Sequence, residues 1–234
     1  YPLVILVLGM VVLLFLGVPI GVALGLAAFV GMSMISGGGP AVSRLGSVAY
    51  YTFLNYAFSP IVLFVFMGEI IVFTGIGVQL FEAVSKWVGR IPGSMAVSTI
   101  GASGLFGAIC GVSTAGALTI GELAIPEMQK AGYDNSMATG TVCAGGTLSI
   151  LIPPSVAFVL YGVASEQSIG ALFLAGVIPG ILEVILYSIY AVIYGLGHPE
   201  TRPLTSFSWQ ERISSLGAIL PVAVLFIIVL GSIY

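Results

Sequence analysis

The sequence predicts an all-α, polytopic membrane protein, and its composition carries this prediction. Of its 234 residues, 59% are hydrophobic and only 6% are charged, and its mean hydropathy is +1.18. Soluble domains carry about 25% charged residues, which keep their surface hydrated. Six Lys and Arg and nine Asp and Glu cannot do this for a globule of this size. Soluble enzymes, nucleic-acid-binding proteins and disordered tails are therefore excluded.

The first third of the chain is expected to hold apolar spans and helices at the membrane surface. Residues 1–43 carry no charge and are too long for one span of about 20 residues. Glycine and proline in residues 17–21 favour two short spans over one long kinked helix. Residues 41–58 and 79–90 have the mixed pattern of interfacial amphipathic helices, and a span over residues 61–78 separates them.

Residues 94–122 predict a re-entrant hairpin. The segment is rich in small residues, and its centre at 110–116 reads Cys-Gly-Val-Ser-Thr-Ala-Gly. Gly111 suits the C-terminal end of one helix, and Ser113 or Thr114 suits the N-cap of the next. Such a turn at membrane depth is tolerated where protein or a cavity surrounds it.

Residues 135–164 predict a discontinuous helix. The expected break, residues 145–155, reads Gly-Gly-Thr-Leu-Ser-Ile-Leu-Ile-Pro-Pro-Ser, and its adjacent prolines remove two backbone donors. Two further spans are expected, over residues 168–196 and from about residue 215 to the end.

The few cationic residues test the hairpin. If residues 94–130 return to the side they entered from, five of the six Lys and Arg share one face and only Arg44 lies opposite. A single crossing would divide them four to two. The positive-inside rule therefore favours the return path, with the shared face cytoplasmic, although two full crossings would give the same distribution.

The two breaks predict a substrate or ion site. Half-helices that end inside the membrane expose carbonyls that can coordinate Na⁺, and those that begin there expose N–H groups that can hold a carboxylate. Hydroxyl groups lie at both breaks, on Ser113, Thr114, Thr147, Ser149 and Ser155. The alternative is that the breaks are kinks that only permit helix packing.

Other polar groups give weaker signals. Glu69 and Glu183 lie near the middle of spans, where a hydrogen-bonded carboxyl group that fixes a helix is favoured over proton or cation coupling. His198 is the only histidine and lies in a polar loop. No nucleophile–base or metal-ligand pairing is apparent, so we do not expect an enzyme.

Residues 101–180 resemble the large membrane subunit of TRAP transporters, the DctM-type permease. Four stretches carry the resemblance: Gly-Glu-Leu-Ala-Ile-Pro-Glu-Met at 121–128, Ala-Gly-Tyr-Asp at 131–134, the break sequence at 145–155, and Ser-Ile-Gly-Ala-Leu-Phe-Leu-Ala-Gly-Val-Ile-Pro-Gly at 168–180. Pro-Pro-Ser after Gly-Gly-Thr is the most specific signal. The resemblance covers most of the chain, more loosely before residue 94.

The resemblance implies an architecture of two inverted repeats, each with a re-entrant hairpin and a discontinuous helix. This chain matches the first repeat. Residues 1–92 would supply scaffold spans and interfacial helices. Residues 93–165 would form the transport region, and residues 166–234 would form further spans that lead toward the second repeat.

The resemblance also implies where ligands bind. Carried over by position, the hairpin tip and the helix break form one Na⁺ site and half of the substrate pocket. The implied Na⁺ ligands are Gly111, Val112, Ser113, Gly145, Gly146 and Thr147. The implied substrate-binding residues are Ser113, Thr114, Thr147, Pro153, Pro154 and Ser155.

The function implied is Na⁺-coupled import of a small organic acid, such as a dicarboxylate or sialic acid, by an elevator-like movement. Na⁺ would be the coupling ion, with no organic cofactor and no nucleic-acid partner. The expected partners are a small TRAP membrane subunit, a periplasmic substrate-binding protein, the remainder of the large subunit and the lipid bilayer. The expected location is the cytoplasmic (inner) membrane of a bacterium or archaeon. The alternatives are another two-hairpin Na⁺/carboxylate symporter and a non-transporting membrane scaffold.

Overall fold

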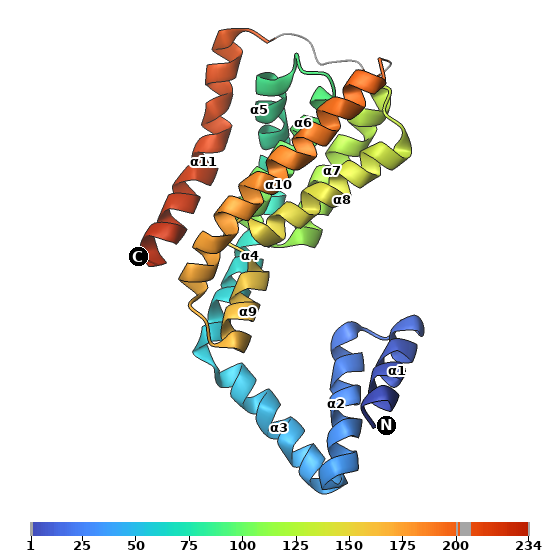
Figure 1. The fold of residues 1–234 in the computed structure, drawn as a ribbon. Helices are drawn as coiled ribbons and strands as arrows, with labels where there is room; N and C mark the ends of the chain where they lie inside the picture. Colours follow the sequence, from blue (N-terminus) through green and yellow to red (C-terminus); the bar gives the residue numbers. More distant parts are fainter. Residues whose placement is uncertain (1, 200, 202–206, 234) are drawn as a thin grey trace. The chain divides into compact units, whose positions relative to one another are not determined.

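The chain folds into helices, as its composition predicts. The computed structural model describes residues 2–199, 201 and 207–233, which form eleven α-helices, one short 3-10 helix and no strand (Figure 1). The helices fall into two compact units, Tyr1–Phe58 and Ser59–Tyr234. The all-α fold class is therefore confirmed. The division into scaffold and transport segments is functional and stays a prediction.

The first unit is a helical hairpin followed by a third helix. Its elements are α1 (Pro2–Phe15), α2 (Ile20–Ser36), α3 (Gly38–Leu54) and a 3-10 helix, η1 (Tyr56–Phe58). The chain turns after α1 because Gly17 adopts a left-handed φ of 79° and Pro19 starts the next helix. Close packing holds the pair together, since a Cβ on Gly31 would lie 2.8 Å from Leu6 Cδ1. The prediction of two helices rather than one is confirmed.

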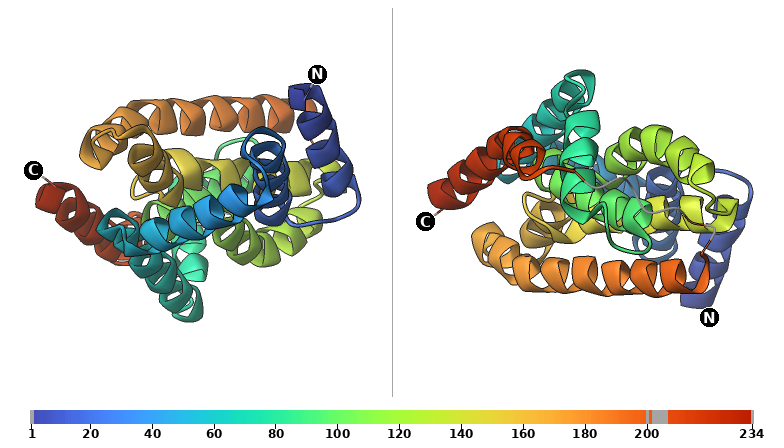
Figure 2. Two further views of the ribbon diagram at one scale, coloured as in Figure 1. Left: turned by 90° about the horizontal axis from the view of Figure 1, so that it is seen from below. Right: turned by 90° about the horizontal axis from the view of Figure 1, so that it is seen from above.

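The second unit is built around one buried helix, α6. Its elements are α4 (Ser59–Phe73), α5 (Ile76–Val88), α6 (Ser94–Cys110), α7 (Ser113–Lys130), α8 (Asn135–Leu151), α9 (Val156–Ser165), α10 (Ile169–Gly197) and α11 (Trp209–Ile233). Helix α6 contacts α4, α5, α7, α8, α10 and α11, and all but two of its residues are buried. Figures 1 and 2 show α10 running beside α8.

Three element boundaries differ from the sequence prediction. The span expected over residues 61–78 ends at Phe73, because Gly75 at a φ of 70° turns the chain into α5. Helix α11 begins at Trp209 rather than near residue 215. A capping box sets this start: the Ser208 N–H donates to Glu211 Oε2 at 2.7 Å, and the Glu211 N–H donates to Ser208 Oγ at 3.3 Å.

The third difference concerns the break. Helix α8 continues through Gly145 and Gly146 to Leu151, so the break occupies residues 152–155 and the predicted start at Gly145 was wrong. Glycine alone does not end a helix that is packed on its neighbours. The two prolines do, because each lacks an N–H group and restricts the residue before it.

Lengths and composition suit a membrane. Helix α10 and residues Trp209–Val229 of α11 are each long and apolar enough to cross one, whereas α8 and α9 reach that length only together and are bent by 44° at the break. Helix α6 is apolar but has 17 residues, fewer than the about 20 that one crossing needs. These features fit a hairpin and a broken helix in a membrane-embedded protein.

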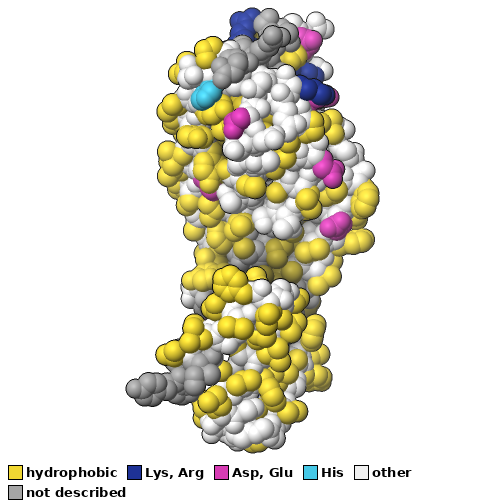
Figure 3. All heavy atoms as spheres, turned by 90° about the vertical axis from the view of Figure 1, so that its right-hand side faces the viewer, with side chains coloured by type: hydrophobic (Ala, Val, Ile, Leu, Met, Phe, Trp, Pro, Cys, Tyr) yellow, Lys and Arg dark blue, Asp and Glu magenta, His cyan; other side chains and the backbone are white. Residues whose placement is uncertain are grey.

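Cationic side chains gather at one end of the second unit. Lys86 and Arg90 lie at the end of α5, Lys130 ends α7, and Arg212 lies in the first turn of α11. Figure 3 shows Lys and Arg side chains on this face only at that end. The arrangement is the one expected if α6 and α7 return to the side from which they enter.

Candidate substrate and ion site

The hairpin tip consists of a two-residue turn between α6 and α7. Gly111 closes α6 in a left-handed conformation, with a φ of 66°, and its N–H donates to the Gly107 carbonyl at 2.8 Å. Val112 is extended, and Ser113 begins α7. Glycine is favoured here because a residue with a Cβ is strained at this φ. The predicted helix–turn–helix is confirmed.

The helix break lies between α8 and α9. The Ile152 N–H makes the last helical bond, to the Leu148 carbonyl at 2.8 Å. Pro153 and Pro154 follow, joined by a cis peptide bond, and both are fully buried. Ser155 is extended and precedes α9.

The two breaks meet, although they are about 40 residues apart in sequence. The Val156 N–H, at the start of α9, donates to the Gly111 carbonyl at 3.2 Å. The backbones touch so closely that a Cβ on Gly111 would lie 2.6 Å from the Pro154 carbonyl oxygen. The Ser155 hydroxyl is fully buried here and has no hydrogen-bond partner in the described part of the chain. We call these contacting segments, residues 111–113 and 152–156, the junction.

One face of α8 packs tightly on the hairpin through glycine. A Cβ on Gly145 would lie 2.7 Å from Ser103 Cβ, and a Cβ on Gly107 would lie 2.7 Å from Ser149 Cα. Real Cβ atoms do not make such short contacts, so α6 and α8 can approach this closely only with glycine at these positions. The hydroxyls of Ser103 and Ser149 are fully buried and unpaired within the described residues.

The structure brings together most of the predicted site residues. The junction contains Gly111, Val112 and Ser113 from the tip and Pro153, Pro154 and Ser155 from the break. Gly146 also faces the hairpin, since its Cβ would lie 3.0 Å from Ala117 Cβ and 3.5 Å from the Ser113 carbonyl oxygen. Thr114 is exposed in the first turn of α7. Whether these residues bind substrate or Na⁺ stays a prediction.

Thr147 lies apart from the junction. Its hydroxyl contacts the Ala144 carbonyl at 2.6 Å and Glu183 Oε1, on α10, at 2.9 Å. The Tyr187 hydroxyl donates to the same Glu183 oxygen at 2.7 Å. Glu183 Oε1 is therefore hydrogen-bonded and joins α10 to α8 through Thr147, as expected, whereas its Oε2 is buried without a partner in the described residues.

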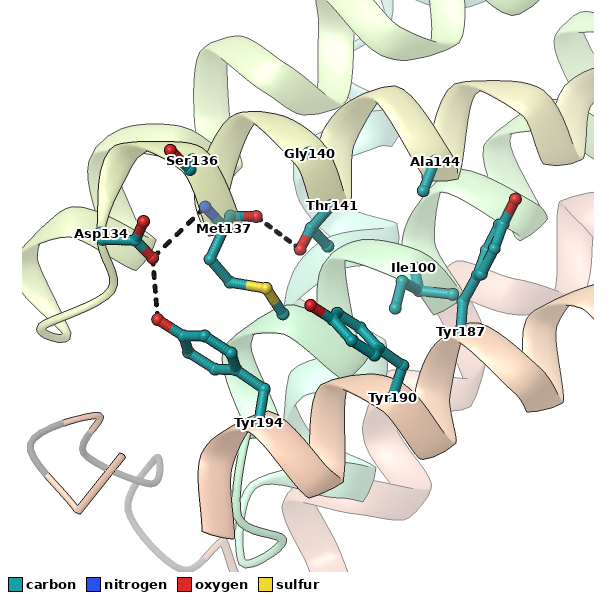
Figure 4. A pocket seen from close by; sticks show the side chains of 10 residues that line it. All are labelled: Ile100, Asp134, Ser136, Met137, Gly140, Thr141, Ala144, Tyr187, Tyr190 and Tyr194. Atoms are coloured by element: carbon teal, nitrogen blue, oxygen red, sulfur yellow. Dashed lines mark hydrogen bonds between the residues drawn. The ribbon is translucent and has the colours of Figure 1, made fainter. Parts of the chain in front are cut away.

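A separate cavity of about 680 Å³ lies between α8 and α10 (Figure 4). Its walls include Tyr187, Tyr190 and Tyr194 from α10 and Gly140 from α8. At one end Asp134 Oδ1 accepts hydrogen bonds from the Tyr194 hydroxyl at 2.8 Å and from the backbone N–H of the third residue of α8 at 3.3 Å. The Tyr194 bond is the main reason that the pKa of Asp134 lies below its ordinary value.

Sequence reasoning missed the helix contacts that build the site. Ser103, Gly107 and Gly111 recur every four residues on α6, and Gly145 and Ser149 do so on α8. This spacing places each set on one helix face. It could have suggested that the two faces pack together, because small residues allow helices in membranes to approach closely.

Helix α4 also approaches the hairpin end. A Cβ on Gly68 would lie 2.8 Å from Cys110 Sγ, and the neighbouring Glu69 interacts electrostatically with Cys110. The sequence did not indicate that this mid-span acid would lie near the tip. Glu69 is exposed, so it is available to groups that approach the tip from outside the unit.

A helix–turn–helix hairpin whose tip meets a broken helix is typical of membrane proteins built like secondary transporters, in which discontinuous helices line the ion and substrate sites. Residues 7–234 match the family described as the tripartite ATP-independent periplasmic transporter, DctM component. The chain belongs to this family. The resemblance that the motifs suggested is confirmed.

Relatives of this chain are named for different transported compounds. The ectoine/5-hydroxyectoine TRAP transporter large permease protein of Ruegeria pomeroyi is 33% identical over 97% of this chain and 53% of its own length. The C4-dicarboxylate TRAP transporter large permease protein of Pseudomonas aeruginosa is 34% identical over 82% and 45%. The sialic acid TRAP transporter large permease protein of Vibrio cholerae is 37% identical over 75% and 41%. The chain therefore spans about half the length of these relatives.

Proposed function

We propose that this chain supplies one hairpin and one broken helix to the large membrane subunit of a Na⁺-coupled, binding-protein-dependent importer of a small organic acid. The importer would lie in the cytoplasmic membrane of a bacterium or archaeon. It would work with a small membrane subunit and a periplasmic substrate-binding protein. Membership of the DctM family supports the transport function, and Na⁺ coupling rests on the junction.

The observation that carries this proposal is the hydrogen bond between the Val156 N–H and the Gly111 carbonyl. It joins the two breaks, so the carbonyl end of α6 lies beside the ends of α8 and α9. Helix ends gathered at one place provide the partial charges that ion and carboxylate sites in transporters use.

The chemistry of the junction suits Na⁺. Carbonyl and hydroxyl oxygens coordinate this ion, and the junction offers carbonyls of Gly111 and Pro154 beside the buried, unpaired Ser155 hydroxyl. A second buried and unpaired hydroxyl, that of Ser149, lies one helical turn before the break. A buried hydroxyl without a partner is costly, so a bound cation near Ser155 would relieve that cost.

An anionic substrate would bind at the opposite helix ends. The first turns of α7 and α9 present backbone N–H groups with partial positive charge. Ser113 and Thr114 add hydroxyl donors at the start of α7. The names of the relatives specify C4-dicarboxylate and sialic acid in two cases and ectoine in a third, so we propose an organic acid as the class of substrate.

The tight contact between α6 and α8 supports movement of the hairpin and the broken helix as one body. Interdigitated glycine and serine contacts at two successive turns leave no room for α6 to slide along α8. An elevator-like mechanism requires such a rigid element that carries both sites. The movement would take place against the neighbouring helices and the rest of the permease.

Transport by the intact permease tests this proposal. The permease and its small membrane subunit would be reconstituted in liposomes, with the binding protein added outside and a radiolabelled acid as substrate. We expect uptake only with an inward Na⁺ gradient and with the binding protein present. Uptake that is the same in Na⁺ and in choline would contradict the coupling.

The substrate itself is identified through the partner. Titration of the binding protein with dicarboxylates, sialic acid and ectoine by calorimetry would show which compound it binds. We expect an organic acid to bind most tightly. A binding protein that ignored the anionic acids and bound only zwitterionic ectoine would refute the proposed substrate class while leaving the Na⁺ coupling open to the uptake test.

A further inference from the structure

A second cavity lies on the side of α6 away from the hairpin. It is an apolar groove of about 480 Å³ between α5, α6, α10 and α11. The residues that line it are all apolar or glycine, and they include Val84, Gly104, Ala108, Ile219, Ala223 and Phe226. The groove forms because glycine and alanine on α6 have small side chains, whereas the side chains of α5 and α11 that border them are longer.

The groove leads toward a cluster of cations. On α11, Ile219, Ala223 and Phe226 line the groove, and Arg212 lies on the same helix face two turns earlier. Helix α5 contacts α11 and carries Lys86 in its last turn, and Arg90 follows two residues after the helix ends. Three of the six Lys and Arg of the chain therefore lie at the end of α5 and the start of α11, two of the helices that wall the groove.

None of these three cations forms a salt bridge within the described residues. Within the described residues the only salt bridge joins Lys130 to Glu127. Glu211 is near Lys86, but its carboxylate accepts hydrogen bonds from the Ser208 N–H and hydroxyl at the start of α11. Arg212 Nε is shielded from solvent and has no hydrogen-bond partner in the described part of the chain. The site thus has donors that an anion could satisfy.

Both tryptophans of the chain lie beside these cations in sequence, Trp87 next to Lys86 and Trp209 three residues before Arg212. Trp87 is 40% exposed and Trp209 is 70% exposed, and the Arg212 guanidinium lies 5.3 Å from the centre of the Trp209 ring. Tryptophan is enriched at the level of lipid headgroups. The aromatic rings therefore place the cations at the membrane surface and the apolar groove below it, among the acyl chains.

We propose that this groove binds one anionic phospholipid, with its phosphate at Lys86, Arg90 and Arg212 and an acyl chain along α11. Charge complementarity selects an anionic headgroup, because three cations without a salt bridge in the described residues lie where α5 ends and α11 begins, beyond an apolar channel that no charged residue lines. The groove shares one residue with the junction, Ile152, whereas the cations lie near the start of α6, at the other end of that helix from the junction. A lipid held here would fix α11 against α5 and α6 at the end where the hairpin begins.

Native mass spectrometry of the intact permease in mild detergent tests this proposal. Phosphatidylglycerol and phosphatidylcholine with the same acyl chains would be titrated separately. We expect phosphatidylglycerol to bind at least about tenfold more tightly. The Lys86→Ala/Arg90→Ala/Arg212→Ala variant should lose that preference, and Arg212→Lys should keep most of it. The matched control Lys130→Ala removes a cation that is paired with Glu127 and should change nothing.

A second variant tests the groove separately from the charges. Ala223→Phe fills the groove and leaves every cation in place, so both lipids should bind at least about tenfold more weakly. Inorganic phosphate at millimolar concentration should not displace phosphatidylglycerol if the acyl chain contributes. Circular dichroism and gel filtration would verify that each variant is folded.

Several results would overturn the proposal. Equal affinity for the two lipids would refute anionic selectivity. Retention of phosphatidylglycerol by the triple variant, or equal loss in Lys130→Ala, would refute the assigned cations. Displacement by inorganic phosphate would make the site an anion site without a lipid. Absence of any bound lipid in the intact permease would show that protein covers the groove.

Discussion

The two faces of α8 attach to their neighbours in different ways. The face toward the hairpin makes close contacts at Gly145 and Gly146 and carries the buried hydroxyl of Ser149, which is unpaired within the described residues. The face toward α10 is held by side-chain hydrogen bonds, from Thr147 to Glu183 and from Tyr194 to Asp134. One helix thus has a close-packed contact on one side and a hydrogen-bonded contact beside a cavity on the other.

The difference suggests which contact moves and which stays fixed. Interdigitated contacts lose about a quarter to a half of their attraction when a gap of about 0.5–1 Å opens, because packing interactions fall steeply with distance. A few hydrogen bonds between long side chains can be broken and remade at a net cost of about 1 kcal/mol each. We therefore expect α8 to remain with the hairpin during transport, while its contact with α10 is replaceable. Four substitutions test this, from the largest expected effect to the smallest.

The largest effect is expected on the close-packed face. Gly145→Leu places a side chain where Ser103 leaves no space for even a Cβ, at a cost of roughly 3 kcal/mol or more. Uptake in proteoliposomes should be abolished while the permease still assembles. Gly140→Leu is the matched control on the same helix, because nothing lies within 4 Å of its Cβ position. Full activity in Gly145→Leu would show that transport does not need the close contact between Gly145 and Ser103.

A smaller effect is expected at the tip. Gly111→Ala puts alanine at a φ of 66° and its Cβ against the Pro154 carbonyl oxygen. Gly75→Ala has the same backbone strain, at a φ of 70°, with no atom within 4 Å. The strain alone costs about 1–2 kcal/mol in each. We expect Gly111→Ala to lower the melting temperature further than Gly75→Ala, and equal melting temperatures would show that the junction contact is unimportant.

The hydrogen-bonded face should tolerate change. Thr147→Val keeps the side-chain shape and removes the hydroxyl that contacts Glu183, at a cost of about 1 kcal/mol. The melting temperature should fall by about 2–4 °C, and the Na⁺ dependence of uptake should be kept. Loss of that dependence in Thr147→Val would instead make Thr147 an ion ligand, as the motif alone implied.

The smallest effect concerns acid stability at the polar end of the cavity. The Tyr194 bond holds the pKa of Asp134 below its usual value of 3.8. A lowered pKa in the folded state stabilises the protein above the usual pKa, and this contribution is lost as the pH falls through the lowered value. As the pH falls below about 4, the melting temperature of the wild type should therefore decrease more than that of Tyr194→Phe. Parallel pH profiles for the two proteins would contradict the assignment.

The sequence was sufficient to predict where most helices begin and end, but it was insufficient to predict which helices contact one another. Gly111 and the paired prolines Pro153 and Pro154 show where helices stop, because their effects on the backbone are local. Local rules also misplaced the start of the break at Gly145. A glycine inside a helix and a glycine at its end look alike until the neighbouring helix is known, and here Ser103 is that neighbour.

The partners of single side chains were equally hidden. Nothing in the spacing of Thr147 and Glu183, which are 36 residues apart, indicates that they bond. Likewise the approach of Gly107 to Ser149 depends on the packing of α6 on α8. The recurrence of small residues at four-residue intervals does predict close packing, but it does not identify which helices pack together.

Direct measurement of Na⁺ binding tests the central claim, that the junction of the two breaks holds the coupling ion. Radiolabelled Na⁺ would be bound to the intact permease in detergent, with Gly111→Ala and its control Gly75→Ala measured alongside. The junction predicts saturable binding that is weakened at least about tenfold in Gly111→Ala and kept in Gly75→Ala. Equal binding by the wild type and Gly111→Ala would contradict it.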